Sequence, residues 1–149
     1  SLGGENSDAL DDAVRGAIEQ GVTFVVAAGN SDADACSGSP NRVASAVTVG
    51  STTREDQRSS FSNHGECLDL FAPGSDITAA WYQEDDEVNT ISGTSMASPH
   101  VAGSVALILG AEPDLSPASV STRLDELATR NVLGSIEEGS PNRLLRVPQ

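Results

Sequence analysis

The chain has 149 residues, the length of about one domain, which is enough to bury a hydrophobic core. Hydrophobic residues make up 38% of it and aromatic residues only 3%, so we expect a core of closely packed alanine, valine, leucine and isoleucine. The 22 acidic residues outnumber 8 basic residues, all arginine, and the net charge of -14 makes nucleic acids and anionic membranes poor partners.

The acidic composition has two interpretations, which the sequence leaves open. Dense carboxylates and a lack of lysine suit a surface adapted to high salt, and they equally suit a coding bias combined with ordinary solubility. The longest apolar stretch, residues 101–109, is far too short to span a bilayer. No export signal begins at Ser1, so we expect any such signal to lie upstream of this chain.

The first expected element is a helix that is capped by Asn6 or Ser7 and ends at Gly21. Apolar residues recur along one side of it, and aspartates in its first turns suit the positive end of the helix dipole. A strand follows at residues 22–28, VTFVVAA, and it breaks at Gly29-Asn30. Because this run is apolar nearly throughout, we expect the strand to be covered on both faces.

Three further short strands are expected at residues 46–49, 68–72 and 76–80. The loops between them are rich in glycine, proline, serine and asparagine, which favour turns. The acidic run Glu84-Asp85-Asp86-Glu87 suits the exposed tip of a hairpin.

Two helices are expected after the strands. The first starts near Ser95, and its apolar sequence indicates burial in the middle of the domain. The second is capped by Ser116, with Pro117 at the first helical position, where a missing N–H is tolerated. The alternation of helices and strands predicts one compact α/β unit.

The stretch SGTSMASPHVAG, residues 92–103, places a small, hydroxyl-rich loop directly before an apolar helix. Gly93 would let another chain or a ligand approach the backbone. Ser95 would lie at the helix amino terminus, where free N–H groups and the helix dipole stabilise an alkoxide or oxyanion. Serine before an apolar helix is also an ordinary cap, so this feature alone leaves both interpretations open.

This stretch resembles the nucleophile signature of subtilisin-like serine peptidases. Three other segments resemble the same family in the same order: VVAAGN (25–30), RSSFSNHG (58–65) and DLFAPG (69–74). SLGG, AGNSDADAC and SFSN are most similar to its proteinase K branch. The resemblance implies a three-layer α/β fold with a parallel sheet, of which residues 1–149 would be the carboxy-terminal part of a single catalytic domain.

Carried over residue by residue, the resemblance makes Ser95 the nucleophile of a serine endopeptidase, which attacks the peptide carbonyl. Asn30 would point its side-chain amide into the oxyanion hole, beside the backbone N–H of Ser95. Without that resemblance, an asparagine after a strand is more simply interpreted as a helix or turn cap.

The resemblance also assigns two walls of a substrate cleft. Ser1-Leu2-Gly3 would pair with the substrate backbone as an added strand, and Ala27-Ala28-Gly29 would line the pocket for the side chain before the scissile bond. Since the second wall is small and uncharged, we expect polypeptide substrates with a broad preference for apolar or aromatic side chains.

A serine nucleophile needs a base, and in this family the aspartate and histidine of the triad precede the serine. His100 lies five residues after Ser95, about 140° around the helix, so its ring would face away from the hydroxyl and we expect a packed, hydrogen-bonded histidine. His64 is expected on the surface. The chain by itself is therefore predicted to be inactive.

From the residues alone, Cys36 and Cys67 are either two buried thiols or one disulfide, and the resemblance implies that they are bonded to each other. A disulfide indicates an oxidising, extracellular setting. By the same resemblance, Asp69 matches the carboxylate of a structural calcium site, whose other protein ligands would be backbone carbonyls near Ala44 and Ala46. No catalytic cofactor is implied.

The sequence thus predicts a secreted subtilisin-like endopeptidase in which the missing amino-terminal half of the catalytic domain is a partner. Two alternatives stay open. One is a truncated, non-catalytic relative that binds peptides in the remaining cleft, and the other is a piece that folds only with its other half. An upstream segment with an aspartate and a histidine would favour the enzyme, and a start codon near Ser1 would favour the peptide-binding relative.

Overall fold

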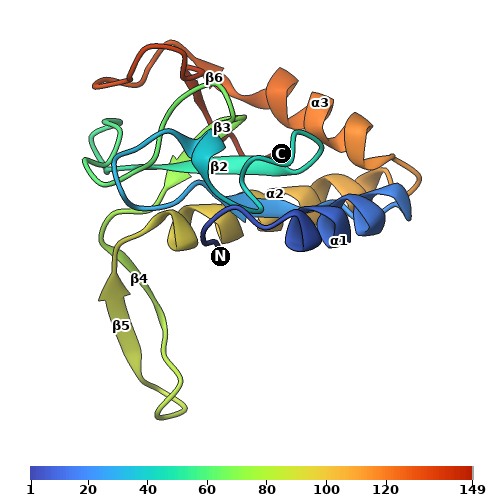
Figure 1. Cartoon of the computed structure of the whole chain (residues 1–149). Helices are drawn as coiled ribbons and strands as arrows, with labels where there is room; N and C mark the ends of the chain where they lie inside the picture. The colour runs from blue at the N-terminus through green and yellow to red at the C-terminus, as the bar shows by residue number, and fades with distance from the viewer. Residues whose placement is uncertain (149) are drawn as a thin grey trace.

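The computed structural model describes residues 1–148, in which helices and loops surround a mainly parallel sheet (Figure 1). The elements are α1 (Asp8–Glu19), β1 (Val25–Ala27), the 3-10 helix η1 (Ala35–Ser37), β2 (Val47–Thr52), β3 (Leu70–Pro73), β4 (Ile77–Ala80), β5 (Val88–Ile91), α2 (Thr94–Ala111), α3 (Pro117–Leu127), β6 (Thr129–Arg130) and β7 (Arg143–Leu144).

Five strands form the main sheet in the order β1-β2-β3-β7-β6. Strands β1, β2, β3 and β7 run parallel, and the two-residue strand β6 is antiparallel to β7 at one edge. The register places Val25 beside Val47, and Val49 beside Leu70. This sheet confirms the predicted α/β fold, and it also contains β6 and β7, which the sequence did not reveal.

The two faces of the sheet carry separate clusters of buried side chains. On one face, side chains of β2 and β3 pack against α2 and α3. On the other face, Val26 packs with Val14 of α1, and Phe71 packs with Ala28 and Leu68. Complete burial of a side chain such as that of Phe71 stabilises the fold by about 1.5–3 kcal/mol. Because residues alternate between the faces of a strand, the clusters define the three predicted layers.

Helix α1 begins directly after the predicted cap Ser7, whose hydroxyl accepts a hydrogen bond from the N–H of Leu10 at 3.4 Å. Within the helix, the fully buried Asp11 forms an ion pair with Arg42. Burial would raise the pKa of Asp11, but hydrogen bonds, including that from Arg42, outweigh this effect, and the pKa lies below its ordinary value. The ion pair fixes α1 to the loop that leads into β2.

Strand β1 is shorter than the predicted strand at residues 22–28. The N–H of Val22 donates to the carbonyl of Ala17 at 3.2 Å, so Val22 still belongs to the turn that ends α1. Ladder pairing starts only where β2 runs alongside, with Val25 opposite Val47.

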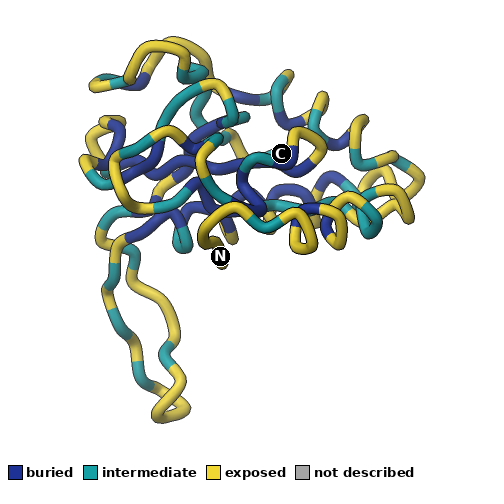
Figure 2. Tube along the Cα trace, in the orientation of Figure 1, coloured by how far each residue is buried: buried dark blue, intermediate teal, exposed yellow. Residues whose placement is uncertain are grey.

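The predicted strand at residues 76–80 belongs to a separate antiparallel hairpin rather than to the main sheet. Strand β4 pairs with β5, with Ile77 opposite Ile91 and Ala80 opposite Val88. The acidic run at residues 84–87 connects the two strands, as expected for a hairpin tip. Figure 1 shows the hairpin extending away from the sheet, and Figure 2 shows that most of it is exposed.

Helices α2 and α3 start close to the predicted positions. Ser116 caps α3, because its hydroxyl accepts a hydrogen bond from the N–H of Ser119 at 3.2 Å. Helix α2 begins one residue earlier than Ser95 and is only partly buried: Val101 is 0% exposed, whereas Leu107 is 56% exposed. The expected burial in the middle of the domain therefore applies to one side of α2 in residues 1–148. Among these residues, no helix has both the length and the hydropathy needed to cross a bilayer.

Candidate active site

The end of β1 places Asn30 at the amino end of α2. Gly29 adopts φ +104°, and a Cβ built on it would lie 2.5 Å from the side-chain nitrogen of Asn63, so a larger residue would be both strained and obstructed. The Gly29 N–H donates to the hydroxyl of Thr94 at 3.1 Å, which ties this turn to the first residue of α2.

The side-chain oxygen of Asn30 accepts two hydrogen bonds from Thr94, one from the backbone N–H and one from the hydroxyl, each at 2.8 Å. The cap residue of α2 is Gly93, which has no side chain to satisfy the free N–H groups. Asn30 therefore caps α2 across 64 residues of sequence, and its orientation leaves the amide nitrogen available for another partner.

The amide nitrogen of Asn30 and the backbone nitrogen of Ser95 approach the same point. A Cβ built on Gly93 would lie 3.5 Å from the Asn30 nitrogen and 3.6 Å from the Ser95 nitrogen. Two N–H donors near a helix amino terminus, where the dipole is positive, favour negative charge beside them. Ser95 is the second residue of α2, so its hydroxyl belongs to the same site.

Ser95 contacts the first residue of the chain. Its hydroxyl donates to the Ser1 carbonyl at 3.3 Å, and the Ser1 hydroxyl donates to the Ser95 carbonyl at 2.9 Å. In residues 1–148, neither histidine hydrogen-bonds Ser95, so this hydroxyl has no side-chain base there.

The structure agrees in part with the predictions for the two histidines. His100 is exposed rather than packed, although its Nδ1 does hydrogen-bond the Met96 carbonyl at 2.8 Å. His64 is a half-buried surface residue, and its backbone hydrogen-bonds Ala33 and Ala35.

The residues predicted to bind substrate line one cleft together with the two predicted catalytic residues. Its volume is about 500 Å³, and its lining includes Asn41 and Asn63 as well as Glu5 at the amino-terminal side. The predicted residues in the lining are Ser1, Leu2, Gly3, Ala27, Ala28, Gly29, Asn30 and Ser95. The cleft is thus built from the chain start, the end of β1 and the start of α2.

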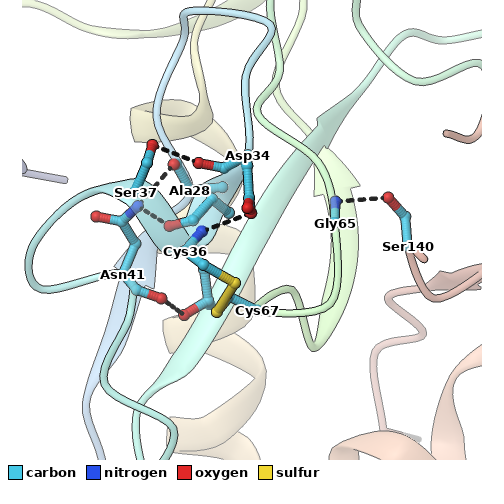
Figure 3. Close-up of a disulfide and its surroundings, with 10 residues drawn as sticks. Ala28, Asp34, Cys36, Ser37, Asn41, Gly65, Cys67 and Ser140 are labelled. Atoms are coloured by element: carbon cyan, nitrogen blue, oxygen red, sulfur yellow. Dashed lines mark hydrogen bonds between the residues drawn. A yellow bond between two sulfur atoms is a disulfide. The ribbon is translucent and has the colours of Figure 1, made fainter. Parts of the chain in front are cut away.

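A disulfide between Cys36 and Cys67 holds the loop beside this cleft (Figure 3). The backbone adds to this link, since the Ala35 N–H donates to the His64 carbonyl at 2.8 Å. The pairing agrees with the one that the family resemblance implied. It fixes the segment after Asn30 to the segment before β3, so the cleft wall is cross-linked.

Reduction of this disulfide is expected to destabilise the fold. The bond joins residues separated by 31 positions. A loop of this size lowers the entropy of the unfolded chain enough to stabilise the fold by about 3–4 kcal/mol. Denaturant unfolding with and without a reductant measures this difference, and the intact mass should rise by two hydrogens on reduction. Two thiols that can be alkylated before reduction would contradict the pairing.

The three residues predicted to bind a metal border a second, smaller hollow. Asp69, Ala44 and Ala46 line it together with Arg42 and Glu66, and its volume is about 300 Å³. One carboxylate oxygen of Asp69 accepts a hydrogen bond from the Thr48 N–H at 2.7 Å. Burial raises the pKa of Asp69 despite this bond. A partly buried carboxylate in a hollow is an oxygen ligand of the kind that calcium prefers. Within the described residues, no cluster of three acidic, histidine or cysteine side chains has the geometry of a metal site.

Sequence reasoning missed three polar residues that shape the cleft. Thr94 orients Asn30. Asn63 accepts from the N–H groups of Ser31 and Ala33, and so shapes the turn after Asn30. The third residue, Asn41, lines the cleft. Thr94 and Asn63 had a visible signal, because they lie inside the stretches SGTSMASPHVAG and RSSFSNHG, whereas Asn41 had none.

Comparison with known proteins identifies this arrangement. The Subtilase family profile matches residues 1–144. The chain is 57% identical over 148 residues to an extracellular serine proteinase of Thermus sp. (strain Rt41A), covering 99% of this chain and 36% of that protein. It is 55% identical over 147 residues to alkaline serine exoprotease A of Vibrio alginolyticus, covering 97% of this chain and 27% of that protein.

Solved structures show the same similarity. A cold adapted subtilisin-like serine proteinase superposes with a TM-score of 0.95 at 55% identity, covering 99% of this chain and 53% of that one. A protease from Pseudoalteromonas arctica PAMC 21717 superposes with a TM-score of 0.90 at 27% identity, covering 98% of this chain and 47% of that one. The chain thus spans about half the length of these solved relatives and about a third of the sequence relatives. With a profile match over nearly its whole length, it belongs to the subtilase family of serine peptidases.

Proposed function

We propose that this chain supplies the nucleophile and the oxyanion hole of an endopeptidase that hydrolyses internal peptide bonds. Ser95 attacks the scissile carbonyl, and the developing oxyanion accepts hydrogen bonds from the Asn30 amide and the Ser95 backbone N–H. The aspartate and histidine of the triad come from outside residues 1–149, in the amino-terminal half of the catalytic domain.

The observation that carries this proposal is the pair of hydrogen bonds from Thr94 to Asn30. They hold the Asn30 oxygen on the helix, and the Asn30 nitrogen lies near the same point as the Ser95 backbone nitrogen. A donor pair that is fixed before substrate binds needs little reorganisation during the reaction, which is the condition for strong oxyanion stabilisation. A residue that served only as a cap would not require its nitrogen to face the serine.

The cleft suits an extended polypeptide with an apolar or aromatic side chain before the scissile bond. The Gly4 backbone pairs with the Ser39 backbone in an antiparallel bridge, which holds the chain start as an extended segment beside the cleft. On the other side, the buried Ala27 and Ala28 offer a small, uncharged wall. Such a wall leaves room for a large ring and gives it an apolar surface.

The test is the digestion of an unfolded protein by the enzyme completed with an amino-terminal half. The proposal expects internal cuts, mainly after apolar and aromatic residues, and no cuts by the Ser95→Ala variant. A completed enzyme that binds such peptides without cleaving them would instead favour the alternative of a non-catalytic peptide-binding relative. The specific observation behind that alternative is the Ser95 hydroxyl, which donates to the Ser1 carbonyl and not to a base.

We also propose that Asp69 and the backbone carbonyls near Ala44 and Ala46 hold a structural calcium ion. Support comes from the hollow that these residues share and from the partial burial of the carboxylate. A bound cation offsets the unfavourable burial of a negative charge. The ion would fasten the start of β2 to the start of β3 and has no part in the reaction.

Chelation should therefore lower the melting temperature, and an Asp69→Ala variant should melt at one temperature with or without a chelator. Differential scanning calorimetry measures both. A Glu66→Gln variant, changed at another acidic residue of the same hollow, should keep its sensitivity to the chelator. Identical melting of the wild type in calcium and in chelator would show that no ion binds.

Finally, we propose that the protein acts outside the cell. The Thermus relative is named an extracellular proteinase, and the Cys36–Cys67 disulfide persists in an oxidising compartment.

A further inference from the structure

The floor of the substrate cleft carries a buried polar side chain that the proposed chemistry does not use. Asn41 is 6% exposed and lies in the loop between η1 and β2. Its amide nitrogen donates to the carbonyl of Ala28, at 3.2 Å, and to the carbonyl of Ala35. Figure 3 shows these bonds beside the disulfide. Because only the nitrogen of the amide can donate, the two carbonyls fix which end of the amide faces them.

The amide of Asn41 lies beside Gly38 and Gly3. A Cβ built on Gly38 would lie 3.1 Å from the amide oxygen and 3.2 Å from the amide nitrogen, whereas a Cβ built on Gly3 would lie 3.8 Å from the oxygen. Both glycines line the same cleft as Ser95. Within residues 1–148, the oxygen accepts no hydrogen bond, whereas the amide nitrogen has two acceptors. Because positions 3 and 38 have no side chain, this unpaired acceptor stays open to the cleft.

We propose that Asn41 is a specificity-determining residue, whose amide oxygen accepts a hydrogen bond from a donor at the tip of the substrate side chain before the scissile bond. This inference rests on the proposed function and narrows its substrate class from aromatic side chains to tyrosine in preference to phenylalanine. The two rings bury the same apolar area against Ala27 and Ala28. Only the tyrosine hydroxyl satisfies the oxygen, because phenylalanine covers it and leaves it unpaired.

A neutral donor suits this position better than a charged one. The Asn41 side chain offers one amide oxygen. The carboxylate in the lining, that of Glu5, lies at the amino-terminal side of the cleft. A lysine ammonium that reached the floor would lose its hydration for a single neutral acceptor. The phenolic hydroxyl loses less hydration and makes the same hydrogen bond.

The first test compares kcat/KM for two peptide anilides that differ only in tyrosine or phenylalanine before the scissile bond. The wild-type completed enzyme should prefer tyrosine by about three- to tenfold, the effect of one neutral hydrogen bond. The Asn41→Ala variant should have a ratio of about one. The matched control is Ser37→Ala, which removes a hydroxyl from the same lining and should keep the tyrosine preference. Equal rates in the wild type, or an unchanged preference in Asn41→Ala, would overturn the proposal.

A second variant covers the case in which Asn41→Ala does not fold. Gly38 has an extended backbone, with φ -136° and ψ 168°, which alanine adopts readily. The Gly38→Ala methyl group would lie 3.1 Å from the Asn41 oxygen and 3.2 Å from its amide nitrogen. It would cover the oxygen, so this variant too should abolish the tyrosine preference. Retention of the preference in this variant would contradict the proposal.

A binding measurement separates this inference from the proposed function. N-acetyl-tyrosinamide and N-acetyl-phenylalaninamide are titrated into the folded Ser95→Ala form of the completed protein and followed by NMR at the Asn41 amide. Tighter binding of the tyrosine compound, lost in Ser95→Ala/Asn41→Ala, supports the role of Asn41 even if the protein hydrolyses nothing. Equal binding of the two compounds refutes that role even if hydrolysis is fast.

Discussion

The 149-residue chain by itself is expected to hydrolyse no peptide anilide, and activity is expected to appear when an amino-terminal half with the triad aspartate and histidine is supplied. A serine hydroxyl is almost wholly protonated at neutral pH, and Ser95 donates to the Ser1 carbonyl rather than to a base. In subtilisin, loss of the base alone lowers kcat by about 10⁶-fold, and we transfer that figure to this relative. The rate at which the aniline is released from the substrate, measured at equal concentrations of the isolated chain and of the completed enzyme, gives the ratio of the two activities.

The Ser95→Ala variant of the completed enzyme is the control for contaminating peptidases. It should be as inactive as the isolated chain. The nucleophile and the base act as a unit, so the loss of either one removes nearly all of the rate enhancement that the triad provides. Steady hydrolysis by the purified chain that vanishes in Ser95→Ala would mean that a base is present within these residues after all.

Replacement of Asn30 by alanine should lower kcat of the completed enzyme by about 10²–10³-fold, the loss known for the corresponding donor in subtilisin. KM should change little, since the oxyanion exists in the transition state and not in the bound substrate. Steady-state kinetics with one anilide separates the two constants. A loss that fell on KM alone would assign Asn30 to substrate binding.

Because Asn30 also caps α2, a structural effect must be distinguished from a catalytic one. Asn30→Asp keeps an oxygen for the N–H and hydroxyl of Thr94 and lacks the amide donor. It should therefore melt close to the wild type, whereas Asn30→Ala loses about 0.5–2 kcal/mol of capping energy. Both variants should lose kcat. Full activity in Asn30→Asp would mean that the amide nitrogen has no role in catalysis.

Local signals predicted the helices well. Ser7 and Ser116 both cap helices where the sequence placed them, because a cap depends on residues within one turn. The apolar runs around Val47 and Leu70 likewise became central strands. These elements follow from short-range preferences and from burial on both faces of the sheet.

Long-range pairing accounts for what the sequence did not predict. Strands β6 and β7 have two residues each, which is too few to show the alternation of apolar and polar residues that marks a strand. They form because Leu144 pairs with Phe71 and with Thr129. The hairpin of β4 and β5 is separate from the main sheet, because these two strands pair with each other and not with its strands.

The site shows the same division between local and distant information. Ser95 and Asn30 could be assigned from the family resemblance, but their geometry depends on Thr94, whose bonds to Gly29 and Asn30 bridge more than 60 positions. Asn41 was invisible because it carries no motif, and its role follows from the carbonyls of Ala28 and Ala35 around it. Directional hydrogen bonds between distant segments are not encoded in any short stretch.

The identity of Ser95 as the nucleophile is tested most directly by covalent labelling of the completed enzyme with a fluorophosphonate, which reacts with an activated serine. Mass spectrometry of the digested protein should find one label per molecule, on the peptide that contains Ser95. The Ser95→Ala variant should take up no label. A label on any other serine, or equal labelling of the Ser95→Ala variant, would contradict the assignment.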